Sequence, residues 1–459
     1  MKRLNILLFT LLALACTSCS DDFFNQVPSN QVVSSSYYES SSDFDMALTA
    51  CYQKLKSEVS FFLTEIEYRG DSNDLDAVAV STQSRYDLDH FEDISTNTIL
   101  ESEWSVEYNL IYRCNSMLDH IDDIGDFEKH DQYMAEAMFL RAWAHFNLYR
   151  VFGCVPIVTK VLSPAEAALA PRCTDDEMYE YLSTDLKEAA SMLPESYTGD
   201  EIGRVTDCAA NAFLGRVAAT FHKYDDAVTA LTAAMGNKNF GLVATTADAI
   251  DVDNKQNKEI LFSVRYNKAD NLGHGAWYTI TVPSEATNPT ERLKDAYGTG
   301  DNRADLLGWT KMTTGNNYVL NKWYDTYDAT YNTVVGNDFP MIRYAEVTLL
   351  MAEALNELGE SGSALTYLNM TRTRAGLVAL TTNDVSSKDG IRKEILDEDQ
   401  REFAYEGHRW FDLVRMGYAA DYFTSLGYTI DSHNLIMPIP NAQIEIVGDD
   451  SILWQNPGY

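Results

Sequence analysis

The residues with the clearest chemical potential are two carboxylates four positions apart, Glu402 and Glu406, within REFAYEGHRWFDLVRMG (401–417). On a helix, residues four apart lie on the same face. Glycoside hydrolysis uses two carboxyl groups that flank the sugar at about 5–9 Å, and this spacing fits that range. The competing interpretation is that both carboxylates are structural, and a pair without a cleft favours it.

Other signals of catalysis are absent from the sequence. It has no Gly-x-Ser-x-Gly elbow, no Walker loop and no His-Glu-x-x-His. Its eight His residues are scattered, and none has the spacing of a metal-ligand pair. We therefore expect no catalytic residue, no metal and no cofactor.

The composition favours a large folded protein with an acidic surface. The chain has 459 residues, of which 45% are hydrophobic, enough for a sizeable core. Its formal net charge is -34. A surface with this charge repels phosphate backbones, so we expect no nucleic-acid partner.

The first twenty residues have the pattern of a bacterial lipoprotein leader. Lys2 and Arg3 precede an apolar run (4–15) that is too short to span a membrane, since spanning takes about 20 residues. Cys16 and Cys19 follow, and either resembles the lipidated Cys of a lipobox. We favour Cys19, with residues 1–18 as signal peptide and 19–42 as a lipidated N-terminus and tether anchored in outer-membrane lipid; Cys16 is the alternative.

Helical periodicity dominates the rest of the chain. Small residues twelve positions apart, Gly215 with Ala227 and Ala352 with Ala364, match the spacing of tetratricopeptide (TPR) helix pairs. We predict a mainly α fold, a TPR-like superhelix of helical hairpins. The expected helices begin near residue 43 and include 101–123, 132–152, 175–193, 341–358, 363–375 and 391–416, followed by an extended tail.

Two stretches interrupt this pattern. Residues 71–98 are polar and are predicted to be a loop. Residues 236–340 contain one short expected strand (259–265) and dense aromatic residues, which indicates a large, loop-rich insertion. The predicted organisation is therefore an N-terminal helical region (43–235), the insertion (236–340) and a C-terminal helical region with its tail (341–459).

Five blocks stand out, in order, over nearly the whole mature chain: AEAMFLRAWAHFNLYRVFGCVPIV (135–158), DFPMIRYAEVTLLMAEALNELG (338–359), LNMTRTRAGL (368–377), REFAYEGHRWFDLVRMG (401–417) and WQNPGY (454–459). Together they resemble the SusD/RagB family of nutrient-binding lipoproteins. The segment CSDDFF after the leader also resembles the start of mature SusD-like proteins. One departure is 398–400 (EDQ), where the family more often has Glu-Arg-Arg; we interpret it as a helix-surface change.

The resemblance implies a surface-exposed lipoprotein of the outer membrane that captures a glycan and delivers it to a SusC-like TonB-dependent transporter. It makes Glu402 and Glu406 part of the scaffold, so we expect no enzyme activity. It also favours structural ion pairs at helical spacing, Arg343 with Glu346 and Arg409 with Asp412. The alternatives are a RagB-like peptide-binding member of the family and a TPR scaffold that binds only proteins.

Glycan sites of this family are expected on loops outside the helical frame, here 71–100 and 266–337. Sugar rings stack on aromatic faces, and their hydroxyls need planar polar partners. Trp323, Tyr324, Trp104, Trp410 and Trp454 fall in scaffold segments and are expected to be buried. For any single loop residue, an ordinary solvated position is the competing interpretation. The predicted glycan-binding residues are Trp277, Tyr278, Trp309, Tyr86, Asp71, Asn73, Asp74 and Arg85.

Overall fold

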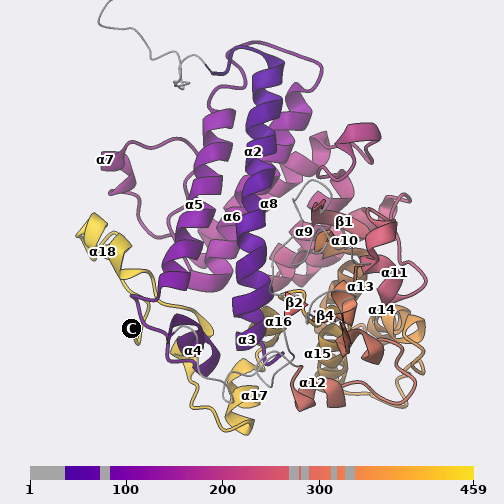
Figure 1. Cartoon of the computed structure of the whole chain (residues 1–459). Helices are drawn as coiled ribbons and strands as arrows, with labels where there is room; N and C mark the ends of the chain where they lie inside the picture. The colour runs from indigo at the N-terminus through magenta and orange to yellow at the C-terminus, as the bar shows by residue number, and fades with distance from the viewer. Residues whose placement is uncertain (1–36, 73–82, 268–278, 281–288, 312–317, 326–335) are drawn as a thin grey trace, which may run out of the picture.

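The computed structural model describes residues 37–72, 83–267, 279–280, 289–311, 318–325 and 336–459. Most of this part of the chain is helical, and successive helices pack against one another in antiparallel pairs (Figure 1). The predicted mainly α, TPR-like superhelix is therefore confirmed. Within the described ranges, every helix is too short or too polar to cross a bilayer.

The N-terminal helices stand side by side in the order of the sequence. In Figure 1 the long helices α2, α5, α6 and α8 run upright, and α9 and α10 continue the array. Their bounds are α2 (Ser41–Ser60), the π-helical turn η3 (Phe61–Glu65), α3 (Ile66–Arg69), α4 (Gln83–His90), α5 (Thr98–Leu118), α6 (His130–Phe152), α7 (Pro164–Ala167), α8 (Asp175–Met192), α9 (Asp207–Thr220) and α10 (Tyr224–Gly236).

In the described parts of residues 236–340, the elements are short helices and strands. Strand β1 pairs antiparallel with β5, and β4 lies between β2 and β3 in a small second sheet. The bounds are α11 (Thr246–Ile250), β1 (Ile260–Val264), β2 (Thr279–Ile280), α12 (Glu291–Asp295), β3 (Trp309–Lys311), β4 (Tyr318–Leu320) and β5 (Phe339–Arg343).

The C-terminal helices extend the array and then return to its beginning. Helix α13 packs on α10, and the tail runs back to the α5 side of the molecule (Figure 1). There the backbone N–H of Asn441 donates to Ser95 O at 2.8 Å. The bounds are α13 (Tyr344–Glu357), α14 (Ser361–Arg374), α15 (Lys388–Phe403), α16 (Arg409–Arg415), α17 (Ala419–Ser425) and α18 (Asn441–Val447).

Local sequence explains where the helices begin, end and meet. The Thr174 hydroxyl accepts from the Glu177 N–H and forms a capping box at the start of α8. Helix α6 ends at Gly153, whose φ of 74° suits glycine. A Cβ on Gly215 would overlap the Leu231 side chain, which shows why a small residue is needed where α9 meets α10.

One aromatic cluster locks the helical array to the insertion. The ring centroids of Trp143 on α6 and Phe213 on α9 lie 4.8 Å apart. Phe139 on α6 reaches Phe262 on β1 at 5.3 Å. All four rings are buried. Each such ring pair stabilises the fold by about 0.5–1.5 kcal/mol in addition to the free energy gained from burying apolar area. The insertion is therefore anchored in the same core as the helices.

Three predicted boundaries were wrong. Within the predicted loop 71–98, residues 83–90 form the helix α4, which buries Leu88 against the core. Residues 341–343 belong to the strand β5 and not to the helix that follows, because β5 pairs antiparallel with β1. Pro340 lies opposite Ser263 in this pair, and an edge strand tolerates a proline, which has no N–H to donate. The predicted tail also contains α17 and α18 and is not simply extended.

The predicted helix 391–416 is two helices, α15 and α16. Between them Tyr405 and Gly407 have φ values of 63° and 77°, in the left-handed region, so a right-handed α-helix cannot continue through them. The Gly407 N–H donates to Glu67 Oε1 at 2.6 Å, so a contact with a distant helix stabilises the break. Sequence periodicity continues across the turn because both halves bury one face against the same core.

Candidate functional site

Glu402 and Glu406, the carboxylates with catalytic spacing, lie in a buried ion network. Glu402 accepts from Arg343 Nη1 and Arg303 Nη1, each at 3.0 Å, and from Arg374 Nη2 at 2.5 Å. Burial opposes ionisation of Glu402, but the surrounding guanidiniums outweigh it and hold its pKa well below the usual range. A carboxylate so held carries no proton to donate and faces no solvent.

The network is larger than the two predicted pairs. Glu406 accepts from Lys322 Nζ at 2.6 Å and from Arg343 Nε through its other oxygen at 2.8 Å. Arg343 therefore does not pair with Glu346, which instead pairs with Arg216 of α9. The i, i+3 pairing fails because Arg343 is the last residue of β5, so its side chain turns toward α15.

The second predicted pair, Arg409 with Asp412, is also wrong. Asp412 Oδ1 accepts from Arg415 Nη1 at 2.7 Å, on the same helix. The Arg409 Nη1 donates to the Leu396 carbonyl at 3.0 Å. In both cases a buried arginine bonds to a residue of another element: Arg343 of β5 and Arg409 of α16 both reach α15. Spacing along one helix cannot reveal such contacts.

Arg85 and Tyr86, two predicted glycan contacts, lie together on α4. Arg85 makes a two-pronged ion pair with Glu65, at 2.8 and 2.7 Å, and keeps 29% of its side chain exposed. The Tyr86 ring stacks on His90 at 3.8 Å between centroids with an interplanar angle of 15°. Helix α4 thus carries a partly exposed cation and an aromatic ring at successive positions, each held by a different neighbour.

Asp71, also predicted to contact glycan, holds three segments together. Its left-handed backbone (φ 68°) ends the turn after α3. Its carboxylate is paired with Arg292 of α12 and accepts from the Tyr422 hydroxyl at 2.7 Å. Its carbonyl accepts from Thr290 Oγ1 at 3.0 Å. These contacts leave Asp71 4% exposed, so it offers no free carboxylate to a ligand.

Trp309 lies on another element, strand β3, with its ring half-buried against the core. Trp104, Trp410 and Trp323 are buried, as expected. Tyr324 and Trp454 were expected to be buried but are 44% and 42% exposed. The other predicted positions lie outside the described residues: Trp277, Tyr278, Asn73, Asp74 and the lipidation candidate Cys19.

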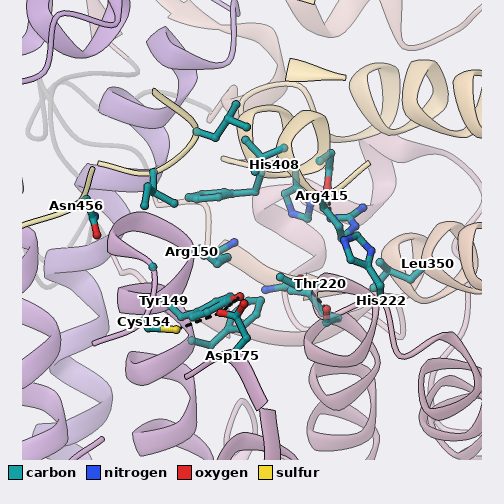
Figure 2. A pocket seen from close by; sticks show the side chains of 18 of the residues that line it. Tyr149, Arg150, Cys154, Asp175, Thr220, His222, Leu350, His408, Arg415 and Asn456 are labelled. Carbon is teal, nitrogen blue, oxygen red and sulfur yellow. Dashed lines mark hydrogen bonds and ion pairs between the residues drawn. The ribbon is translucent and has the colours of Figure 1, made fainter. Parts of the chain in front are cut away.

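A cavity of about 490 Å³ lies where the helical array meets the returning tail (Figure 2). Figure 2 shows Arg150 between Tyr149 below it and His408 above it. Burial lowers the pKa of His408 well below its usual value, so its imidazole is neutral. The lining combines aromatic rings with four arginines, a mixture suited to a polar ligand that has apolar faces: Phe146, Tyr149, Phe403, Phe411, Trp454, Arg150, Arg172, Arg216 and Arg415.

Sequence reasoning missed this cavity because its lining comes from distant positions. Arg150 ends α6, Arg216 lies on α9, Phe411 on α16 and Trp454 in the tail. No spacing within one element brings these residues together. The one available signal was WQNPGY at the end of the chain, a specific segment with a Trp that we assigned to the core.

Comparisons with known proteins agree with this architecture. The family model described as "SusD family" matches residues 238–459, and the model described as "Starch-binding associating with outer membrane" matches residues 22–218. A curated relative, SusD-like protein P38 of Formosa agariphila, is 25% identical, and the match covers 92% of each chain.

Solved structures show the same fold. A laminarin binding SusD-like protein is 24% identical, with a TM-score of 0.75, and the match covers 92% of this chain and 100% of that one. Surface glycan-binding protein A of Bacteroides thetaiotaomicron, in complex with laminarihexaose, is 20% identical with a TM-score of 0.72, covering 91% and 99%. The chain belongs to the SusD/RagB family, which confirms the resemblance that its five sequence blocks carry.

Proposed function

We propose that this protein is a glycan-binding lipoprotein of the outer membrane that captures an oligosaccharide at the cell surface and delivers it to a SusC-like TonB-dependent transporter. The family membership carries this proposal. Relatives of the same fold, matched over nine-tenths of the chain, are named as glycan-binding proteins. Acylated Cys19 is the proposed anchor in outer-membrane lipid.

The proposed glycan surface is the one around α4. Arg85 offers donors fixed by Glu65, and Tyr86 offers a ring fixed by His90. A preorganised donor beside a flat ring favours a sugar, because little side-chain entropy is lost when it binds. Asp71, also in the proposed set, is buried and joins α12 and α17 to the end of α3, so its part is to hold these segments together. Trp309, Trp277, Tyr278, Asn73 and Asp74 complete the proposed set.

We further propose that the protein does not cleave the glycan. The pair with catalytic spacing, Glu402 and Glu406, is buried and bonded to four basic side chains. A glycosidase needs one protonated carboxyl group within reach of the glycosidic oxygen. Glu402 is held ionised by Arg374, Arg343 and Arg303, so it cannot serve as that acid at neutral pH.

The test is a glycan array, including laminarihexaose, probed with the chain lacking residues 1–19. Calorimetry on the best glycan then compares Arg85→Ala, Tyr86→Ala, Trp309→Ala and Trp277→Ala. Each should weaken binding about tenfold or more, since one stacked ring or charged hydrogen bond contributes about 1–3 kcal/mol. Arg265→Ala is the control: Arg265 is exposed, and within the described residues its side chain donates to the Ile202 carbonyl at 2.7 Å. Unchanged affinity in all four variants would reject this surface.

A further inference from the structure

The cavity of Figure 2 has a charge distribution that the proposed glycan surface does not explain. Four guanidiniums line it. Two are neutralised: Arg216 pairs with Glu346, and Arg415 pairs with Glu353 at 2.8 Å and with Asp412. The other two, Arg150 and Arg172, have no carboxylate within ion-pair distance among the described residues.

The hydrogen bonds of these two arginines go to neutral oxygens. Arg150 Nη2 donates to Asn147 Oδ1 at 2.6 Å, and its Nε is buried without a partner. Arg172 donates to the carbonyls of Cys154 and Trp454 at 2.5 and 2.7 Å, and to Asn456 Oδ1 at 2.7 Å. Two cations without counter-ions on one cavity are unexpected in a chain of net charge -34.

Arg150 is fixed in place by aromatic rings. Its guanidinium lies 4.0 Å from the ring centroid of Phe411, 4.9 Å from that of Phe62 and 5.1 Å from that of Phe146. Burial lowers its pKa to about 9, which still leaves it charged at neutral pH. The residue is half-buried and its Nε has no hydrogen-bond partner in the described part of the chain, so an anion bound beside it would gain a charge-assisted hydrogen bond.

The acidic groups of the cavity form no ion pair with Arg150 or Arg172 among the described residues. Asp175 accepts from two neutral donors, the Tyr149 hydroxyl at 3.0 Å and Cys154 Sγ at 3.1 Å, so its charge remains in the cavity. Glu346 and Asp412 are paired with Arg216 and Arg415, respectively. Burial and the neighbouring Asp412 raise the pKa of Asp399 well above its usual value, so it adds little negative charge. Four guanidiniums of the lining therefore face the carboxylates of Asp175, Glu346 and Asp412, and the excess positive charge lies at Arg150 and Arg172.

We propose that this cavity is a second binding site, separate from the α4 surface, for a small hydroxylated acid such as a uronic acid. The carboxylate binds at Arg150. The Tyr149 and Thr220 hydroxyls, which donate to Asp175 and to the Arg216 carbonyl, can accept hydrogen bonds from sugar hydroxyls. A volume of about 490 Å³ accommodates one such molecule, since small-ligand sites span about 300–1,000 Å³. The cavity shares no residue with the proposed glycan surface.

The test is calorimetry with D-glucuronate and, as its neutral counterpart, D-glucose. Glucuronate should bind with 1:1 stoichiometry and at least about tenfold more tightly than glucose, because a charged hydrogen bond contributes about 1.5–3 kcal/mol. Arg150→Gln and Arg172→Gln should each lower glucuronate affinity about tenfold, and Arg265→Gln should leave it unchanged. Equal binding of the two sugars, or no binding of glucuronate, would overturn the proposal.

Two further measurements keep the result decisive. Arg150 packs among three phenyl rings, so Arg150→Gln could unfold locally; Arg172→Gln, at the edge beside the half-exposed Trp454, then decides alone. Binding of the array-selected glycan is measured in the same variants. Loss of glucuronate binding with intact glycan binding separates this cavity from the α4 surface, whereas parallel loss of both would show a general folding defect and is checked by circular dichroism.

Discussion

Replacing Glu402 by glutamine gives the sharpest test of whether this carboxylate holds the scaffold together. The buried network contains six basic groups and five carboxylates that contact one another, and the partly exposed Glu394 pairs with one of the six, Arg372, at its edge. The basic members are Arg303, Lys322, Arg343, Arg372, Arg374 and Arg401, and the acidic members are Glu259, Asp301, Glu398, Glu402 and Glu406.

Glu402→Gln removes one negative charge while keeping the shape of the side chain. Three guanidiniums then face an amide, and the buried network loses one negative charge that offsets its cations. Breaking a buried ion pair in this way costs about 3–5 kcal/mol, so we expect the free energy of unfolding to fall by that amount. Equilibrium urea unfolding of the chain without residues 1–19, followed by circular dichroism, measures it.

The matched control is Glu394→Gln on the same helix. Glu394 lies 3.6 Å from Arg372 and keeps 37% of its side chain exposed, so its loss should cost less than about 1 kcal/mol. If Glu402→Gln cost no more than Glu394→Gln, the network would not stabilise the fold, and the structural interpretation of this carboxylate would be refuted.

Two further predictions concern pH and packing. Burial raises the pKa of Glu58 from 4.5 to about 8. Between pH 4.5 and about pH 8, the folded chain keeps the Glu58 proton that the unfolded chain has lost. The contribution of this protonated carboxyl to the free energy of unfolding is therefore complete below pH 4.5 and is lost as the pH rises through about 8. Glu58→Gln should therefore flatten the fall of stability across this window by up to about 1.4 kcal/mol per pH unit, measured by urea unfolding at several pH values; an unchanged slope would contradict the assignment. Gly215→Ala should cost about 1–3 kcal/mol in thermal unfolding because the added methyl overlaps Leu231, whereas Gly362→Ala, which meets open space on α14, should cost nothing; equal effects would reject close approach of α9 and α10 as the cause.

The helical frame could be predicted from the sequence because its signals are local. Apolar periodicity and the cap at Thr174 located α8, and the small residue at Gly215 indicated how α9 meets α10. The break at Gly407 could not be predicted, because it depends on a hydrogen bond that the Gly407 N–H donates to Glu67, 340 positions away. Local pattern thus predicts elements but not the long-range contacts that end them.

The candidate sites show the same limit. Arg85 and Tyr86 could be proposed from a polar stretch, but their partners Glu65 and His90 needed the fold. Arg343 looked like half of an ion pair along one helix, and in the structure it joins β5 to α15. The cavity around Arg150 was not predicted. Its lining includes residues of α6, α9, α13, α15, α16 and the tail, and no local sequence pattern connects these elements.

The central claim is that the protein binds a glycan and releases it unaltered. The most direct measurement incubates the array-selected oligosaccharide with the chain lacking residues 1–19, follows binding by calorimetry, and then analyses the recovered sugar by mass spectrometry. We expect reversible binding that Arg85→Ala weakens, and a recovered oligosaccharide of the original mass. Shorter products, or no binding by any glycan on the array, would contradict the account.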